Sequence, residues 1–398
     1  MDESSRGRDQ DPPALPVEGA VLASVRAALF WIHFGIGVVV AAVVLTMAST
    51  GTIMAFEHEI LAALDARHRI TAPEGTAQLP PSRMLATVTP QLPPGTKPSA
   101  LTVYAEPGAP ALLAAKGSGY WLVDPYSGEI LAESRARAFF ALVEDVHRNL
   151  ALARFDKSSV GKTVTGWTAV GVALLGVSGL YLWWPAKRGG PGRFRRVAFF
   201  RRTGNPAARD FNWHNVIGVW TAPVLVGIAL TGTTISFDGV KKFVTTTFGV
   251  AASRPEPPPA SAKFDLDEAL AEAVRRVPEW TAVNVRWPAR DGKLTLRIRT
   301  GHGTRPDQWS LLTYRVDNGA VASFSRYEEA KTGTKILGWA RWLHTGQALG
   351  LPGQAVGAIT AVGATVLAGT GLTMAWRRMR RTLFARRRGA KGTAQPSA

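Results

Sequence analysis

The segment Trp31-Ile32-His33-Phe34-Gly35-Ile36-Gly37 opens the first long apolar run of the sequence. A similar segment, Trp213-His214-Asn215-Val216-Ile217-Gly218-Val219, opens the third run. The offset that aligns these segments also aligns Thr50-Gly51-Thr52 with Thr231-Gly232-Thr233, and a second offset aligns Gly179-Leu180 with Gly371-Leu372. The sequence therefore predicts two tandem repeats, each with the order helix, soluble lobe, helix.

Four apolar runs are long enough to cross a bilayer. No Asp, Glu, Lys or Arg occurs between Arg26 and Glu57, Lys162 and Lys187, Asp210 and Asp238, or Arg341 and Arg377. Each run exceeds the roughly 20 apolar residues that span the hydrocarbon core. We therefore expect an α-helical membrane protein with transmembrane helices at residues 27–56, 161–186, 211–237 and 344–376, the last including the segment that leads into it.

The net charge of +18 comes largely from two short basic segments, a link at residues 187–210 and a tail at residues 377–398. Short flanks rich in Lys and Arg mark the cytoplasmic side of a membrane. Both termini are therefore expected in the cytoplasm, including a disordered tail at residues 1–26. The lobes at residues 57–160 and 238–343 are expected outside, in a periplasm or its equivalent. Because topology accounts for the basic residues, no nucleic-acid partner is expected.

The chain contains no cysteine. This excludes iron–sulfur clusters, thiolate catalysis, disulfides and covalently attached haem. No Gly-rich fingerprint follows a predicted strand and opens a helix, so a built-in flavin or nicotinamide domain is not expected.

Each lobe is predicted to be a small α+β unit. Residues 264–277 have helical spacing, with Asp265 as N-cap and Glu268 completing a capping box. Alternating residues at 294–299 and 309–316 predict strands, and Asp317-Asn318-Gly319 predicts a hairpin turn. The first lobe has the same order, with a helix near residues 82–88 and strands near 101–105, 111–115 and 121–130. Neither lobe contains a clear nucleophile–base pair, so a structural or docking role is expected.

Within the first lobe, Val123-Asp124-Pro125-Tyr126-Ser127-Gly128-Glu129-Ile130 resembles the signature hairpin of a PepSY domain. The contexts Trp-Ile-His, Val-His-Arg, Trp-His-Asn and Leu-His-Thr-Gly resemble those of the PepSY-associated transmembrane family, over residues 26–381. The resemblance implies an inner-membrane di-haem protein that reduces ferric siderophores during iron uptake.

Four of the seven histidines lie at helix positions related by the repeat. His33 and His214 begin helices that enter from the cytoplasm, while His147 and His344 precede helices that enter from outside. One pair is thus expected near each face of the membrane. Two imidazoles on facing helices can ligate a b-type haem iron. We therefore expect two b-type haems, with irons about 15 to 25 Å apart. The alternative to haem ligation is that these histidines are only polar side chains at the membrane interface.

Two glycines and two arginines lie near these four histidines in the sequence, and three further histidines lie elsewhere. Gly37 and Gly218 each lie one helical turn after their histidine, where they either leave room for a porphyrin edge or allow close helix packing. Arg148 and Arg341 adjoin the outer pair, His147 and His344. They are expected either to be partners for haem propionates or an anionic ligand, or to be solvated side chains. His58 is a rival to His147 as outer ligand, although the repeat places Gly239 opposite it. The two remaining histidines, His68 and His302, are expected on the surface.

These features predict an inner-membrane di-haem reductase. It would pass electrons from an unknown donor, a quinol or a cytoplasmic reductase, to a ferric siderophore in the periplasm, and release Fe(II). Intramembrane histidines are also typical of metal or proton transporters. A third possibility is a membrane-anchored PepSY protein that binds peptides or proteases. The sequence does not identify a catalytic residue.

Overall fold

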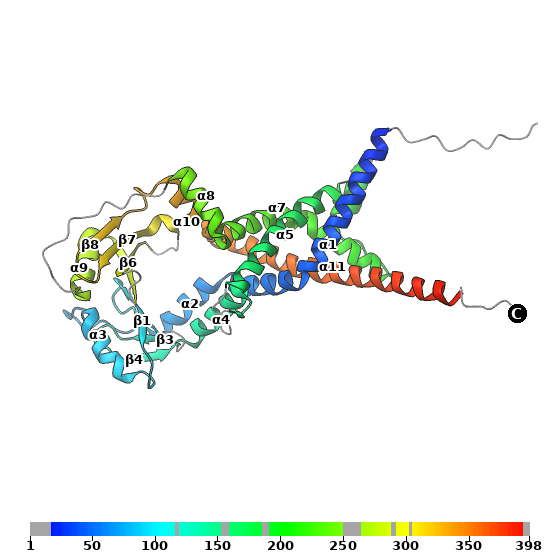
Figure 1. Ribbon diagram of the computed structural model, residues 1–398. Helices are drawn as coiled ribbons and strands as arrows, with labels where there is room; N and C mark the ends of the chain where they lie inside the picture. The colour runs from blue at the N-terminus through cyan, green and yellow to red at the C-terminus, as the bar shows by residue number, and fades with distance from the viewer. Residues whose placement is uncertain are drawn as a thin grey trace, which may run out of the picture.

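The computed structural model describes residues 17–115, 119–152, 159–184, 191–249, 264–287, 292–301 and 305–392. It consists of a bundle of long helices with a β-sheet at one end, and the first and last described helical segments end away from the sheet (Figure 1). Residues 1–16 of the predicted cytosolic tail lie outside the described ranges.

Four helices form the bundle: α1 (Val17–Met54), α5 (Val160–Trp183), α7 (Pro206–Ser236) and α11 (Gly350–Gly392). Each is long and apolar enough to cross a membrane, within residues 23–68, 160–183, 206–236 and 347–382. Helices α1 and α7 each pack against both α5 and α11. The four predicted membrane helices are therefore confirmed.

The helix ends differ from the prediction at both ends of the chain. Helix α1 begins at Val17, so residues 17–26 are helical and not a disordered tail. Helix α11 continues to Gly392, so most of the basic segment that begins at Arg377 extends the last helix. The basic link also contains a short helix, α6 (Pro191–Ala198). Lys and Arg are good helix formers, so basic composition marks a membrane boundary but does not end a helix.

Polar contacts fix the bundle at the end opposite the sheet. The guanidinium of Arg26 donates to carbonyl groups at the end of α5, including that of Trp184 at 3.1 Å. The buried carboxylate of Asp210 on α7 pairs with Arg377 on α11 at 2.7 Å. A cation at a helix C-terminus is favourable, and a buried carboxylate needs a charged partner to offset its desolvation.

The strands of the two lobes form one continuous antiparallel sheet, in the order β4-β3-β2-β1-β5-β6-β7-β8. The strands are β1 (Pro98–Tyr104), β2 (Ala111–Ala115), β3 (Gly119–Val123), β4 (Ile130–Glu133), β5 (Trp280–Arg286), β6 (Lys293–Thr300), β7 (Trp309–Arg315) and β8 (Val321–Ser325).

The strands of the two predicted lobes are therefore joined in one sheet. Strands β1 and β5 pair directly, and the Asn284 side chain donates to Thr102 Oγ1 at 2.8 Å across this junction. Each four-stranded half alone would leave β1 or β5 as an exposed edge, and pairing the two edges satisfies their backbone groups.

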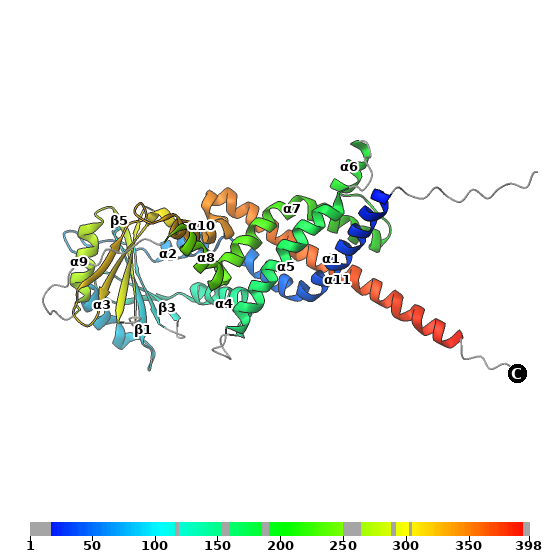
Figure 2. The ribbon, with the colours of Figure 1, turned by 45° about the horizontal axis from the view of Figure 1, so that its top comes forward.

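One face of this sheet carries the hydrophobic core. Helices α3 (Pro81–Val88) and α9 (Leu266–Arg276) cover it, and Figure 2 shows both on the side of the sheet away from the bundle. Met84, Leu113, Leu296 and Ile298 are fully or almost fully buried there. The Asp265 side chain accepts from the backbone N–H groups of residues 267 and 268, which confirms the predicted N-cap of α9.

Four further helices connect the sheet to the bundle: α2 (Glu57–Asp65), α4 (Arg135–Asn149), α8 (Asp238–Phe248) and α10 (Thr332–His344). Helix α4 packs against α1 and α5, and α10 packs against α7 and α8. Short 3-10 helices occur at Ala66–His68, Thr89–Gln91, Pro306–Gln308 and Gln347–Leu349. The ends of α4 and α10 thereby carry His147 and His344 to the bundle.

Candidate functional site

Four histidines form two close pairs between the helices. His33 on α1 faces His214 on α7, with ring centroids 6.5 Å apart and an interplanar angle of 87°. His147 on α4 faces His344 on α10, with ring centroids 6.3 Å apart and an interplanar angle of 68°. The first pair lies on the long bundle helices α1 and α7, and the second lies at the ends of α4 and α10, two of the helices that connect the sheet to the bundle. These are the pairings expected from the sequence.

A hydroxyl group on a neighbouring helix contacts the Nδ1 atom of every one of these imidazoles. The distances are 3.0 Å from His33 to Ser178, 3.0 Å from His147 to Thr50, 3.0 Å from His214 to Thr370 and 3.3 Å from His344 to Thr231. Nδ1 of His344 is also 2.9 Å from the carbonyl oxygen of Ile228.

These contacts determine the tautomer of each ring. Each of the four hydroxyls donates its own proton to the carbonyl one turn earlier in its helix, at 2.6 to 2.9 Å. The hydroxyl oxygen is then an acceptor toward the ring, so Nδ1 carries the proton. Nε2 consequently keeps a free lone pair on all four rings. A hydrogen bond from the other ring nitrogen is the usual support of a metal-bound imidazole.

A glycine follows each of these hydroxyl residues and packs against the same ring. A Cβ atom added to Gly232 would lie 3.1 Å from His344 Cε1, and one added to Gly179 would lie 3.3 Å from His33 Cε1. The corresponding distances are 3.4 Å from Gly51 to His147 and 3.5 Å from Gly371 to His214. We call each Ser/Thr-Gly dipeptide with its imidazole a histidine cradle.

The spacing within each pair suits one metal atom between two Nε2 atoms. An imidazole nitrogen lies about 2.0 to 2.1 Å from a first-row metal, and the ring centre is about 1.1 Å behind it, which separates two ring centres by roughly 6.3 Å. In the described part of the chain, no group of three or more His, Cys, Asp or Glu side chains converges to hold a metal. A porphyrin supplies the four missing nitrogens itself, so the donor set fits bis-imidazole haem iron.

The two pairs are separated along the bundle. Gly51, which packs against His147, lies on the same helix as His33, and Gly232, which packs against His344, lies on the same helix as His214. At a rise of about 1.5 Å per residue, the distance along the helix from histidine to glycine is about 27 Å in both cases. This exceeds the expected iron separation of about 15 to 25 Å, because the outer ligands lie at the very ends of α4 and α10.

Burial favours the neutral form of the pair formed by His147 and His344. It lowers the pKa of His147 to about 4, with a further contribution from His344. Burial also lowers the pKa of His344, and the positive charge of Arg341 acts in the same direction. Neutral imidazoles are the form that binds a metal.

The other predicted site residues have different surroundings. The side chains nearest to Gly37 and Gly218 are Leu175 and Leu367, at 3.8 Å and 3.7 Å from an added Cβ, so both glycines face a neighbouring helix. Arg148 pairs with Glu144 at 2.9 Å. Arg341 stacks over Trp342, with its Cζ atom 5.9 Å from the ring centroid.

His58 and His68 lie outside both pairs. His58 is on α2, and His68 ends the 3-10 helix that follows it. His302, predicted to be a surface residue, lies outside the described residues. Whether His58 contributes to haem binding stays a prediction.

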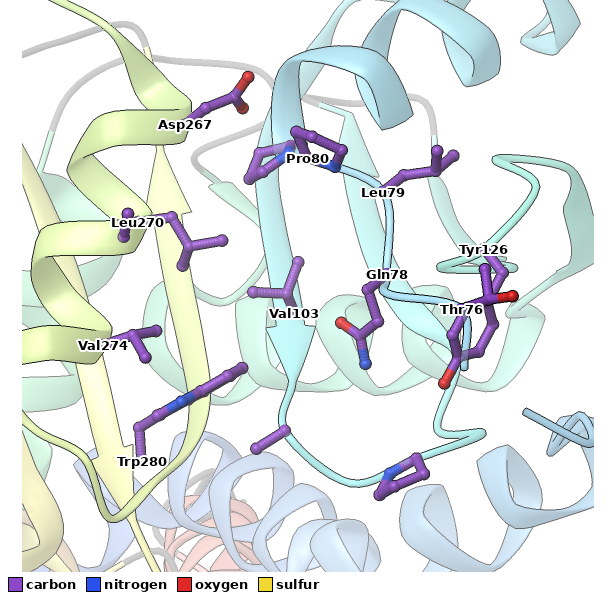
Figure 3. A pocket seen from close by; sticks show the side chains of 14 residues that line it. Thr76, Gln78, Leu79, Pro80, Val103, Tyr126, Asp267, Leu270, Val274 and Trp280 are labelled. Atoms are coloured by element: carbon purple, nitrogen blue, oxygen red, sulfur yellow. The ribbon is translucent and has the colours of Figure 1, made fainter. Parts of the chain in front are cut away.

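A separate cavity of about 580 Å³ lies where the two halves of the sheet meet, on the side of α3 and α9. In Figure 3, Leu270, Val274 and Trp280 face Val103 and Gln78 across it. Its lining is mainly apolar and includes none of the predicted haem-site residues.

Comparison with known proteins agrees with this architecture. No curated protein matches the chain. A family model described as the PepSY-associated TM region matches residues 30–378, nearly the whole described chain. Together with the four apolar helices, this match identifies a multi-pass membrane protein that belongs to the PepSY-associated transmembrane family.

Proposed function

We propose that the protein is a di-haem reductase of a bacterial inner membrane that passes electrons to a ferric siderophore in the periplasm and releases Fe(II). His33 and His214 would hold one b-type haem, and His147 and His344 the other. The observation that carries the proposal is the hydrogen bond at Nδ1 of all four rings, which favours a free Nε2 lone pair on each ring, together with a ring spacing within each pair that suits one iron.

When bound, each haem supplies a one-electron Fe(III)/Fe(II) couple. The protein contributes the orientation and the electronic environment. Ser178, Thr370, Thr50 and Thr231 hold the rings by their Nδ1 atoms, which raises the basicity of the coordinating nitrogen. The adjacent glycines let each ring lie directly against the neighbouring helix.

The charge distribution supports the direction of electron flow. The residues after α5 and the residues that end α11 are rich in Lys and Arg, which favours the cytoplasmic side. The sheet lies at the opposite end of the bundle and would therefore be periplasmic (Figure 2). Both termini would be cytoplasmic, with a quinol or cytoplasmic reductase as donor at the pair formed by His33 and His214. The four equivalent cradles also support two tandem repeats.

The periplasmic acceptor follows from this arrangement. An acceptor at the outer pair has to receive electrons one at a time from outside the bilayer. Ferric iron in a chelate of hard oxygen ligands accepts one electron, and the resulting Fe(II) binds such ligands more weakly. Reduction would thus release iron without breaking a bond in the chelator.

An absorption spectrum and an anaerobic reoxidation experiment test the proposal. Purified protein should carry close to two b-type haems per chain, with the α and β bands of low-spin bis-imidazole iron. After reduction with dithionite, each molecule should convert up to about two ferric chelates, because it holds two electrons and each iron takes one. A ferrous chelator in the cuvette would report the released Fe(II).

Two results would count against the proposal. Protein without a Soret band, purified from haem-replete cells, would favour a histidine-based transporter or a peptide-binding PepSY protein. Haems that stay reduced with a panel of ferric chelates, yet are oxidised promptly by a quinone, would exclude a ferric siderophore as the electron acceptor. The protein would then still be a transmembrane haem protein.

A further inference from the structure

The sheet face opposite α3 and α9 carries arginines in one half only. Arg286 lies on β5, and Arg297 and Arg299 lie on β6, alternating with the buried core residues Leu296 and Ile298. With Arg341 on α10, we call these residues the arginine face.

The other half of the sheet lacks these charges at equivalent positions. Leu112 pairs with Thr102 in the first half, and Arg297 pairs with Asn284 in the second half, so Leu112 corresponds to Arg297. In the same register, Ala114 in β2 corresponds to Arg299 in β6. Strand pairing alone therefore does not require arginine at these positions, because Leu and Ala occupy them in the same register.

The arginine face has little negative charge of its own. Among the residues that the structure describes, no carboxylate oxygen lies within 4.0 Å of any of the four guanidinium groups. The surrounding protein and the positive charges of Arg286 and Arg341 lower the pKa of Arg297. One carboxylate, that of Glu57, lies close enough to interact with Arg341. Clustered cations without carboxylate partners favour an anionic ligand.

Two of these side chains are held in place. Arg297 stacks over the ring of Trp309, with its Cζ atom 4.7 Å from the ring centroid. The Nε atom of Arg299 donates to Thr281 Oγ1 at 3.3 Å. A guanidinium held by its flat face keeps its N–H groups free at the edge, which is the geometry that binds a carboxylate through two hydrogen bonds. In addition, the buried indole N–H of Trp309 has no acceptor among the described residues.

Arg341 connects the arginine face to the outer histidine pair. It lies one turn before His344 on α10. An anion held by Arg341 would therefore lie close to the pair formed by His147 and His344.

We propose that the arginine face is the binding site for an anionic ferric chelate that presents carboxylate groups to Arg297 and its neighbours. This inference rests on the proposed function, which supplies the ferric chelate as the ligand. It adds that the protein selects chelates with negative charge. A carboxylate-rich chelate matches the face in charge, and its carboxylates match the edge of the Arg297 guanidinium. Neutral or cationic chelates lack both features.

Gallium(III) chelates test binding without electron transfer, because gallium(III) has the charge and size of ferric iron but is not reduced. The full-length, haem-loaded protein would be titrated with gallium(III) citrate and, separately, with the cationic gallium(III) complex of desferrioxamine B. Arg297→Gln should weaken binding of the citrate complex about tenfold or more, the loss of one charged bidentate contact, and leave the desferrioxamine complex unchanged. Arg297→Lys should be intermediate, because it keeps the charge but loses the planar edge.

Arg315→Gln is the matched control. Arg315 lies on the same face of the neighbouring strand β7, but it pairs with Asp317 at 2.9 Å. Arg315→Gln should change the affinity for the gallium(III) citrate complex less than twofold. An unchanged Soret spectrum in every variant would show that the fold and the haem sites are intact.

Equal weakening by Arg315→Gln and Arg297→Gln would overturn the inference, since the effect would then reflect overall charge. Equally tight binding of metal-free citrate would also overturn it, because the face would then recognise a small carboxylate and not a chelate. If the gallium results are as expected but no ferric chelate reoxidises the reduced protein, the proposed function fails while the anion site stands.

Discussion

Replacing Gly232 by alanine should selectively weaken the outer haem. The added Cβ would lie 3.1 Å from Cε1 of His344, whereas the added Cβ of Gly371→Ala would lie 3.5 Å from Cε1 of His214. Carbon atoms attract each other best at about 3.5 to 4.0 Å, so only the first substitution pushes its imidazole away. Both glycines are helical, so the gain in helix propensity, about 1 kcal/mol, is common to the two variants and cancels in the comparison.

The expected magnitude follows from the cost of overpacking. Forcing an extra methyl group into a packed site typically costs about 1 to 3 kcal/mol. If that strain falls on the ligated position of His344, haem affinity at the outer site should fall roughly fivefold to 150-fold. Gly371→Ala should leave the affinity of the inner site nearly unchanged.

Titration of haem-depleted protein with haemin would measure both affinities, and electron paramagnetic resonance of the oxidised protein would distinguish the two low-spin signals. The reasoning predicts loss or shift of one signal in Gly232→Ala and two native signals in Gly371→Ala. A larger effect in Gly371→Ala, or loss of both haems in either variant, would refute the cradle geometry.

Three further outcomes are expected. His33→Ala should remove one haem and His344→Ala the other, each leaving about one haem per chain in a pyridine haemochrome assay; loss of both from either variant would contradict two separate sites. Ser178→Ala should raise the reduction potential of the inner haem, because the His33 ligand loses the hydrogen bond that increases its basicity. Thr231→Val should shift the potential of the outer haem less, since the Ile228 carbonyl still accepts from His344. Equal shifts in the two variants, or no shift in either, in a redox titration would contradict this role of the hydroxyls. Leu296→Ala should destabilise the sheet by about 2 to 5 kcal/mol, because Leu296 is almost fully buried there. The haem spectra should be unchanged, and thermal unfolding recorded together with a haem spectrum would test both expectations.

The membrane helices and the histidine pairs were predictable because their signals are local. A charge-free run of hydrocarbon length predicts a spanning helix by itself, and the matching sequence contexts of His33 and His214 place them at one depth. The strands predicted at residues 294–299 and 309–316 and the predicted Asp265 cap are present as β6, β7 and the N-cap of α9, since alternation and capping depend on near neighbours. Strands β5 and β8 were not predicted.

The joined sheet and the histidine cradles depend on contacts between distant segments. Thr102 and Asn284 are far apart in the sequence, and nothing within either strand specifies that the two edges meet. The dipeptides Thr50-Gly51 and Thr231-Gly232 were visible as repeat markers. Their role became clear only when the structure placed them behind His147 and His344, because helix facing is a tertiary property.

The pairing of β1 with β5 also limits how the protein can move. Transporters of the alternating-access type rock one half of the molecule against the other around a central site. Here the residues of β1 from Ala100 to Tyr104 pair with those of β5 from Ala282 to Arg286 and tie the two halves together at the sheet end of the bundle. Rocking the halves apart would break this ladder and expose the core beneath it. Electron transfer between fixed centres needs no such motion, so a sheet that opposes rocking is compatible with the proposed redox function.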